Sequence, residues 1–274
     1  MTTIAEAGTG DGPAGDVGLR RAAVAWFLVA AVGQIAFVVM ILVHYGTNTV
    51  SGNLARWNDK PLIKGYVAGD TAGNVMFAVH VLLAAVITFG GLAQLVPAIR
   101  ARAPWAHRWN GRLFFVLAVL MAIGGLWLTG VRQTYLSPIS GLAVAVDGVL
   151  ILAFTAIAWR LAVRRRYADH RRWALRTFMV VSGVWFLRVG IMAWVLVTAG
   201  GLGMNRTMSG PADIMLGFGS YLVPLAMLEA YFHAQRSRHA TTKRMVAGAI
   251  VLTTIITAVG VFGTVAFMWL PYRW

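Results

Sequence analysis

Seven long apolar segments, separated by short polar connections, run through the sequence. They cover residues 22–43, 72–97, 113–131, 141–163, 174–199, 212–233 and 246–270. Each is close to the length of about 20 apolar residues that a membrane-crossing helix needs. The pattern predicts an all-α fold: a multi-pass transmembrane helical bundle with about seven spans.

The composition supports this interpretation and sets the domain organisation. Of the 274 residues, 59% are apolar and 12% are charged, whereas soluble domains average roughly 45–50% and about 25%. Residues 1–18 are rich in Gly, Ala and Thr and carry three acidic side chains, which predicts a disordered cytoplasmic tail. Residues 19–274 are then a single transmembrane domain, with little chain left for a soluble one.

The positive charge predicts orientation in the membrane. The net charge is +15. When Arg112, Arg160 and Arg176 are counted at span ends, 17 Lys and Arg residues fall in the N-terminal tail and the second, fourth and sixth connections, against 6 on the other side. Cytoplasmic connections are the basic ones, so we expect the N-terminus inside and the C-terminus outside. Anionic lipid headgroups account for these cations, and nucleic acid is not an expected partner. Trp269, Tyr272 and Trp274 are expected to lie at the outer interface.

Three ionisable side chains lie well inside the predicted spans: His80, Asp147 and Arg188. Such groups are costly in a bilayer and usually face the protein interior or water. We expect Asp147 and Arg188 to form an ion pair, with His80 nearby and Asp213 completing a polar intramembrane pocket. Three roles are open: locking helices together, binding a proton or small molecule, and, for His80, ligating haem.

A second group of candidates lies at the predicted cytoplasmic side. His107 and His170 open the third and fifth spans, and two neutral imidazoles from facing helices can hold the iron of a low-spin haem b. Four neighbouring arginines could neutralise its propionates: Arg108, Arg112, Arg171 and Arg176. The alternatives are anchoring of the connections at lipid headgroups, and a metal set that adds Glu229 and His233. An ion pair between Glu229 and His233 is the simpler expectation for those two. The chain has no cysteine, which leaves no thiolate ligand.

The second and fourth connections resemble one another. Residues 104–112 and 167–176 both carry a His, then an Arg, a Trp and another Arg before a span. This repetition predicts two related helical hairpins, so that spans two to five form a four-helix core.

The combined motifs resemble the uncharacterised bacterial membrane family called domain of unknown function 2306. They are His80, Pro97, His107-Arg108-Trp109, Gly111-Arg112, His170-Arg171-Arg172-Trp173, Arg176 and Arg188. The resemblance implies a bacterial inner-membrane location and no settled activity. A looser similarity in layout is to ascorbate-reducible b-type cytochromes, whose four core helices carry paired His ligands for two haems. Asp147 stands where such a cytochrome would need a His.

Two functions from different classes follow. One is a b-haem electron-transfer protein, a candidate membrane oxidoreductase that works with a quinone or another redox partner; its single haem would be held by His107 and His170. The alternative is a non-redox transporter or sensor that handles a small molecule or protons in the polar pocket. An accessory membrane subunit is a third option.

Overall fold

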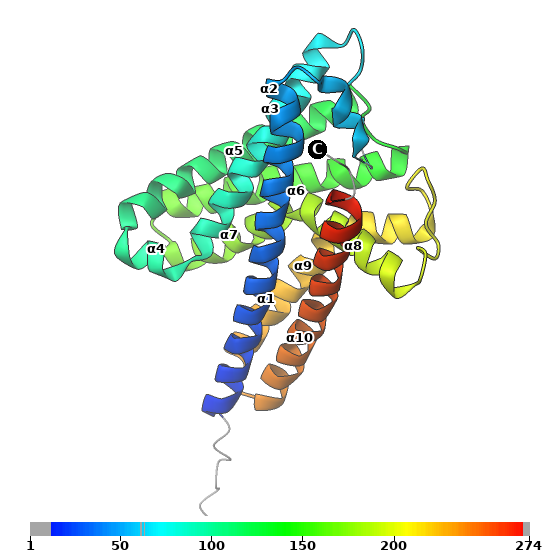
Figure 1. The fold of residues 1–274 in the computed structure, drawn as a ribbon. Coiled ribbons are helices and arrows are strands. Elements are labelled where there is room, and N and C mark those ends of the chain that lie inside the picture. The colour runs from blue at the N-terminus through cyan, green and yellow to red at the C-terminus, as the bar shows by residue number, and fades with distance from the viewer. Residues whose placement is uncertain (1–11, 61, 63, 271–274) are drawn as a thin grey trace, which may run out of the picture.

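The computed structural model describes residues 12–60, 62 and 64–270 of the chain, and its regular elements are all helices (Figure 1). The α-helices are α1 (Gly12–Met40), α2 (Thr47–Val50), α3 (Thr71–Leu95), α4 (Pro97–Arg102), α5 (Pro104–Gly130), α6 (Pro138–Val163), α7 (Tyr167–Val181), α8 (Gly183–Val197), α9 (Pro211–Arg236) and α10 (Ala240–Gly263). Two π-helical turns, η1 (Ile41–Gly46) and η3 (Thr264–Trp269), and a 3₁₀ helix, η2 (Leu54–Asp59), complete the set. The predicted all-α class is confirmed.

Six helices of the described chain are long and apolar enough to cross a membrane, and a bent pair makes a seventh. The first span is unbroken from Gly15 to Val50, because η1 and α2 continue α1. The fifth is α7 followed by α8, which meet at 54° on either side of Ser182. The chain is therefore a multi-pass membrane protein with about seven spans, as the hydrophobic pattern predicts.

Local sequence signals fix where several helices begin. Proline occupies the start of α4, α5, α6 and α9, where its missing N–H costs nothing. The Asp70 carboxylate caps α3 by accepting from the Gly73 N–H at 2.9 Å. Ser137 and Ser140 form a reciprocal capping box at the start of α6. These caps satisfy N–H groups that a helix end otherwise leaves unpaired.

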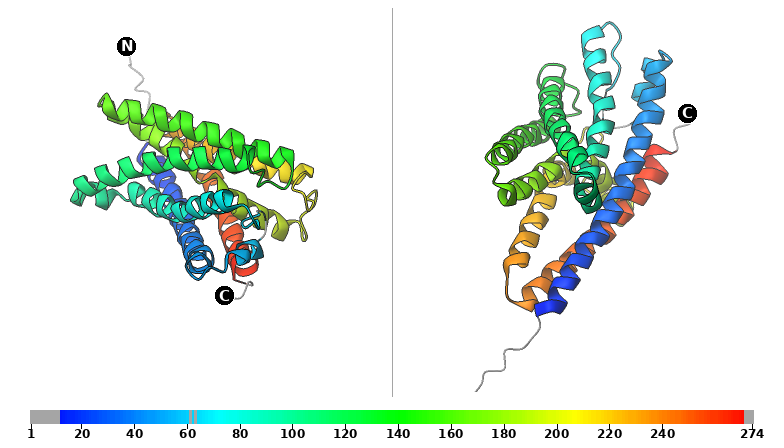
Figure 2. Two further views of the ribbon diagram at one scale, coloured as in Figure 1. Left: turned by 90° about the horizontal axis from the view of Figure 1, so that it is seen from above. Right: turned by 90° about the vertical axis from the view of Figure 1, so that its left-hand side faces the viewer.

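The spans form two groups that cross each other (Figures 1 and 2). In one group α3 packs on α5, α5 on α6, and α6 on α7, which gives the four-helix core expected from spans two to five. In the other, α1 packs along α10, and α8 packs on α10 and α9. The break at Ser182 therefore passes the fifth span from one group to the other.

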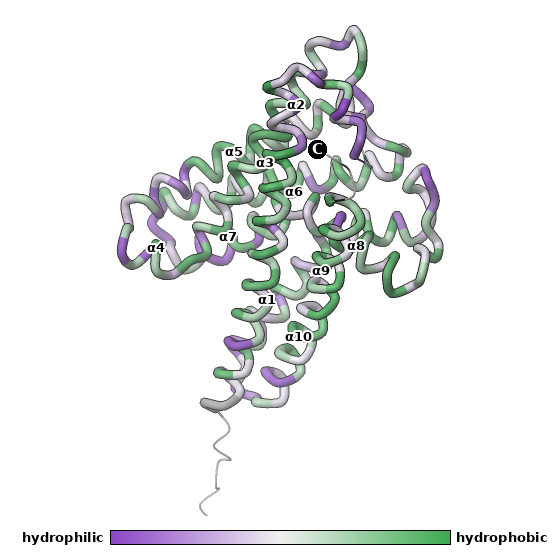
Figure 3. Tube along the Cα trace, in the orientation of Figure 1, coloured by the Kyte–Doolittle hydropathy of each residue, from purple (hydrophilic) through white to green (hydrophobic). Residues whose placement is uncertain are grey.

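The connections separate onto two sides of the molecule. The α4 end, the α6–α7 connection and the α9–α10 connection lie to the left and bottom of Figure 1, whereas the segment after α2 and the connection between α8 and α9 lie at the top and right. Hydrophilic residues gather at these ends and apolar residues along the helices between them (Figure 3). Polar connections thus alternate with apolar helices, as expected of a protein that crosses the membrane several times.

Two sequence expectations need correction. Helix α1 begins at Gly12, so residues 12–18 are helical and do not belong to a disordered tail; residues 1–11 lie outside the described residues. Trp269 is 4% exposed and stacks on Phe37, with ring centroids 5.6 Å apart. Trp269 belongs to η3, and its ring is buried against α1. It is therefore a packing residue of the core and not an interfacial anchor. Tyr272 and Trp274 also lie outside the described residues.

Candidate functional site

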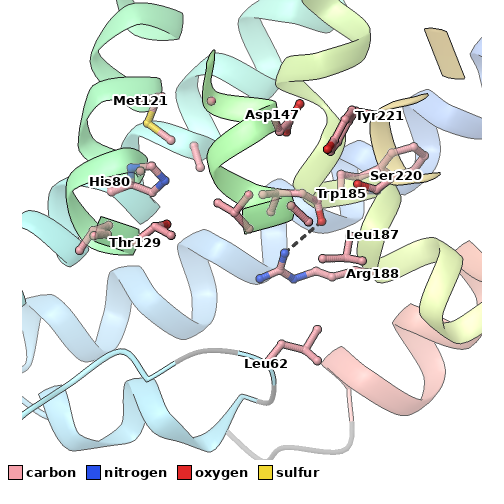
Figure 4. Close-up of a pocket in the computed structure, with 18 of the residues that line it drawn as sticks. Leu62, His80, Met121, Thr129, Asp147, Trp185, Leu187, Arg188, Ser220 and Tyr221 are labelled. Carbon is pink, nitrogen blue, oxygen red and sulfur yellow. Dashed lines mark hydrogen bonds between the residues drawn. The ribbon is translucent and has the colours of Figure 1, made fainter. Parts of the chain in front are cut away.

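A cavity of about 280 Å³ lies where the two helix groups cross. Its wall is mostly apolar and comes from α1, α3, α5, α6, α8 and α9. His80, Asp147, Arg188 and Asp213 all line it. The structure thus places around one cavity the four residues that the sequence suggested for a polar pocket. Figure 4 shows the cavity with three of them labelled.

His80 reaches the cavity from α3. Its ring lies against the glycines of α5: a Cβ built on Gly124 would come within 3.3 Å of its Nδ1, and one on Gly125 within 3.4 Å of its Cε1. Nδ1 is buried and has no hydrogen-bond partner. The ring is positioned by close helix packing and keeps an unused nitrogen.

Asp147 comes from α6 and is 8% exposed. One carboxylate oxygen lies against Gly183, where a Cβ would come within 2.5 Å of it, and the other has no hydrogen-bond partner. Gly183 begins α8. Asp147 is therefore buried at the break in the fifth span, close to the first residue of α8.

Tyr221, on α9, lies beside Asp147 (Figure 4). It is 1% exposed, and its hydroxyl has no hydrogen-bond partner. Nothing in the sequence pattern marks Tyr221 as a pocket residue. Its place in the pocket could not be found from spacing, because it depends on how α9 meets α6.

Arg188 enters the same cavity from α8, apart from Asp147 (Figure 4). Its Nη1 donates to the Val184 carbonyl at 3.0 Å, and its guanidinium lies over the Phe37 ring, 5.5 Å from the centroid. No ion pair between Asp147 and Arg188 is present among the described residues. The expected ion pair is therefore wrong. Asp147 lies against Gly183 at the start of α8, whereas the Arg188 guanidinium bonds the Val184 carbonyl and lies over Phe37.

Asp213 has a structural task at the edge of the cavity. One carboxylate oxygen accepts from the backbone N–H groups of Asn205, at 2.9 Å, and Gly210, at 3.1 Å. These bonds fix the turn that leads into α9.

Gln34, which the sequence analysis missed, also lines the cavity and donates from Nε2 to Ser182 Oγ at 3.2 Å. This bond ties α1 to the break between α7 and α8.

The segment after α2 reaches one end of the cavity, where Leu62 lines it (Figure 4). Trp57 is 1% exposed and packs on Phe77, with centroids 5.4 Å apart. Lys60 donates from Nζ to the Trp269 carbonyl at 2.7 Å, and burial lowers the pKa of its ammonium group. Arg132 donates from Nε to Asp70 at 2.7 Å. This hydrogen bond holds the pKa of the Asp70 carboxyl below its usual range.

The residues proposed for haem lie elsewhere, and only some features suit that role. His107 has a buried Nδ1 without a hydrogen-bond partner, and it interacts electrostatically with His170. His170 Nδ1 lies 2.9 Å from the Ala158 carbonyl oxygen, a contact that orients an imidazole and leaves Nε2 free. Neither ring lines the 280 Å³ cavity.

Two of the four arginines expected at haem propionates contact other side chains, and two are exposed. Arg176 pairs in a bidentate manner with Glu229, at 2.6 and 2.9 Å. Arg112 lies over the Trp109 ring, 4.8 Å from its centroid. Arg108 and Arg171 are exposed. Arg176 and Arg112 are therefore engaged within the protein, whereas Arg108 and Arg171 face outward.

Glu229 also corrects a second expectation. It bonds Arg176 of α7, not His233 of its own helix, because the guanidinium offers two parallel N–H donors to the carboxylate. No group of three or more His, Asp or Glu side chains among residues 12–60, 62 and 64–270 could hold a metal ion. The four-residue metal set with His107 and His170 is not assembled.

Fold and site together define a polytopic membrane protein whose helical bundle encloses a mostly apolar cavity with a few ionisable side chains. Comparison with known families agrees: residues 77–210 match the family described as "Predicted membrane protein (DUF2306)". This is the family that the motifs around His80, His107 and His170 indicated, and the match confirms that resemblance. No curated protein and no solved structure matches the chain.

Proposed function

We propose that the protein binds a small molecule in the 280 Å³ cavity, as a non-redox membrane transporter or sensor. The observation that carries the proposal is the presence of unused polar atoms around one space. His80 Nδ1, Asp147 Oδ1 and the Tyr221 hydroxyl come from three different helices, and none has a hydrogen-bond partner in the protein.

The energetic argument rests on the cost of such atoms. A buried polar group left unpaired costs about 1–3 kcal/mol, and ionisable groups within a bilayer cost more unless they serve a purpose. Three such atoms around one cavity are better explained by a bound partner than by a structural need. The volume is slightly below the roughly 300–1,000 Å³ of ordinary ligand pockets, which favours a small ligand.

Mass spectrometry and thermal unfolding test this proposal. The protein, purified in mild detergent, is examined by native mass spectrometry for a bound small molecule, and its thermal unfolding is followed with octanoate and 1-octanol below their aggregation concentrations. We expect an adduct, stabilisation, or both in the wild-type protein.

Two substitutions on α3 locate the binding. Ala84 lines the cavity, and Ala84→Phe should abolish binding by filling it. Val79→Phe is the matched control, since Val79 is 48% exposed on the same helix and does not line the cavity. A wild-type protein with no adduct and no stabilisation by either compound contradicts the proposal, as does binding that survives in a folded Ala84→Phe protein.

Electron transfer through a haem is a second candidate, favoured by one observation. His170 is oriented by the Ala158 carbonyl, and His107 keeps a free buried nitrogen close enough to interact with it. Absorbance spectra of the oxidised and dithionite-reduced protein test this candidate. A b-type spectrum that is lost in both His107→Ala and His170→Ala supports it, and a colourless preparation from haem-replete cells contradicts it.

A further inference from the structure

Arg188 is the cavity group that the protein itself leaves uncompensated. The guanidinium has five N–H donors, and one hydrogen bond from it is observed, to the Val184 carbonyl. The guanidinium also lies over the face of the Phe37 ring. No carboxylate of residues 12–60, 62 and 64–270 forms an ion pair with it.

Asp147 does not provide the missing charge. Its side chain lies at the start of α8, against Gly183, and beside Tyr221. It lies at the contact of α6 with α8, whereas the Arg188 guanidinium lies over the Phe37 ring of α1, among apolar walls.

The surroundings of Arg188 are suited to an amphipathic anion. Tyr45 is 5% exposed, lines the same cavity and lies close enough to Arg188 to interact electrostatically. The wall beside them is apolar and includes Met40, Phe77 and Leu187. A planar guanidinium with free donors matches a carboxylate in a bidentate manner, and the apolar wall matches a hydrocarbon body.

We infer that the cavity takes a small monocarboxylate with an apolar body, whose carboxylate pairs with Arg188. This inference rests on the proposed binding function and names its ligand class. The unused hydroxyl of Tyr221 and nitrogen of His80 then face the rest of the ligand or the water that accompanies it.

The test compares three probes with the same eight-carbon tail and different head groups: octanoate, 1-octanol and octylamine. Binding to the full chain in lipid nanodiscs is measured by isothermal titration. We expect octanoate to bind best, and Arg188→Gln to weaken its binding about ten- to hundredfold, the loss expected for a hydrogen-bonded charge. Arg188→Lys keeps the positive charge but lacks the two parallel N–H donors of the guanidinium. Its affinity for octanoate should lie between those of the wild type and Arg188→Gln.

Arg206→Gln is the control, because Arg206 is exposed in the connection before α9 and does not line the cavity; it should bind octanoate as the wild type does. Equal binding of octanoate and 1-octanol, both lost in Ala84→Phe, overturns the ligand class and leaves the binding function intact. Preferred binding of octylamine overturns it as well. Absence of binding by all three probes, with no adduct in native mass spectrometry, removes the binding function itself.

Discussion

Single glycines determine how closely the helices of the second group approach. Gly260 on α10 faces the backbone of α8: a Cβ there would collide with the Val189 carbonyl oxygen and come within 2.6 Å of Val189 Cγ1. A backbone atom cannot rotate away as a side chain can. The contact between α8 and α10 therefore depends on the missing side chain at this position.

Gly260→Ala should lower the free energy of unfolding by about 1–3 kcal/mol, the usual cost of overpacking. Gly248→Ala on the same helix is the control, because a Cβ there meets nothing within 4 Å. Its loss of backbone freedom in the unfolded chain should stabilise the protein by roughly 0.5–1 kcal/mol. Both can be measured by unfolding in detergent micelles. Equal effects of the two substitutions would show that α10 is not held against α8 at Gly260.

Protonation of Asp70 should destabilise residues 64–74, which lead from the segment after α2 into α3. The Arg132 hydrogen bond lowers the pKa of the Asp70 carboxyl, and the Gly73 N–H adds to the effect. Because the folded value is the lower one, the stabilisation is complete above the unfolded value of about 3.9 and is lost as the pH falls through the folded value.

Hydrogen exchange of the amides around residues 64–74 should therefore show constant protection from pH 7 to about pH 4 and less protection below. Asp70→Asn should be weakly protected at every pH. Asp59→Asn is the control, since Asp59 is exposed and its pair with Arg56 is long, at 3.4 Å. Protection that ignores pH in the wild type would disprove the role of this carboxylate.

At the scale of helices, the two charges of the cavity belong to separate contacts. Asp147 acts at the junction of α6 with α8, and Arg188 at the junction of α8 with α1, over Phe37. Neither group restrains the other directly. The losses of unfolding free energy caused by substitutions at Asp147 and at Arg188 should then be independent.

Asp147→Asn and Arg188→Gln should add within about 0.5 kcal/mol when combined. The cycle of Arg176→Gln and Glu229→Gln is the positive comparison, because that pair links α7 and α9 directly. Its coupling should be about 0.2–1 kcal/mol, since both side chains are partly exposed. The free energies of unfolding of the wild type, the four single variants and the two double variants are measured in detergent. A coupling above 1 kcal/mol between Asp147 and Arg188 would restore the ion pair that the sequence suggested.

The sequence predicts the membrane spans but not which side chains on different spans form pairs, and the reason is physical. A bilayer demands a long apolar segment at every crossing, so each span is visible on its own. The break in the fifth span is not, because Ser182 and Gly183 are small and leave the apolar pattern intact. Arg176 and Glu229 are 53 residues apart, and only the packing of α7 on α9 selects that pair.

The cavity residues also could be predicted only in part: the sequence indicates the ionisable side chains but not their partners. Ionisable residues inside spans are rare enough that His80, Asp147 and Arg188 could be singled out directly. Their common location did not reveal which of them would pair. Gln34 and Tyr221 escaped notice as pocket residues, since an uncharged polar side chain in a span is common and gives no signal until neighbouring helices are placed.

At the scale of the whole molecule, we predict that the basic connections face the cytoplasm. Asn53→Cys, in the segment after α2, should react with a membrane-impermeant maleimide in intact cells. Ser237→Cys, between α9 and α10, should react only after the cells are opened. The segment after α2 and the α9–α10 connection lie at opposite ends of the molecule in Figure 1. Labelling of Ser237→Cys from outside would reverse the orientation.

The pairing of α1 with α10 has a consequence for biogenesis. These two helices share the most extensive contact of the described bundle, yet Met40 and Ala240 are 200 residues apart. At translation speeds of about 5–20 residues per second, α10 emerges from the ribosome roughly 10–40 s after α1 is complete. During that interval the face of α1 that will receive α10 is open to lipid or to an insertase. A ribosome stalled before residue 240 should therefore leave α1 retained beside the insertion machinery.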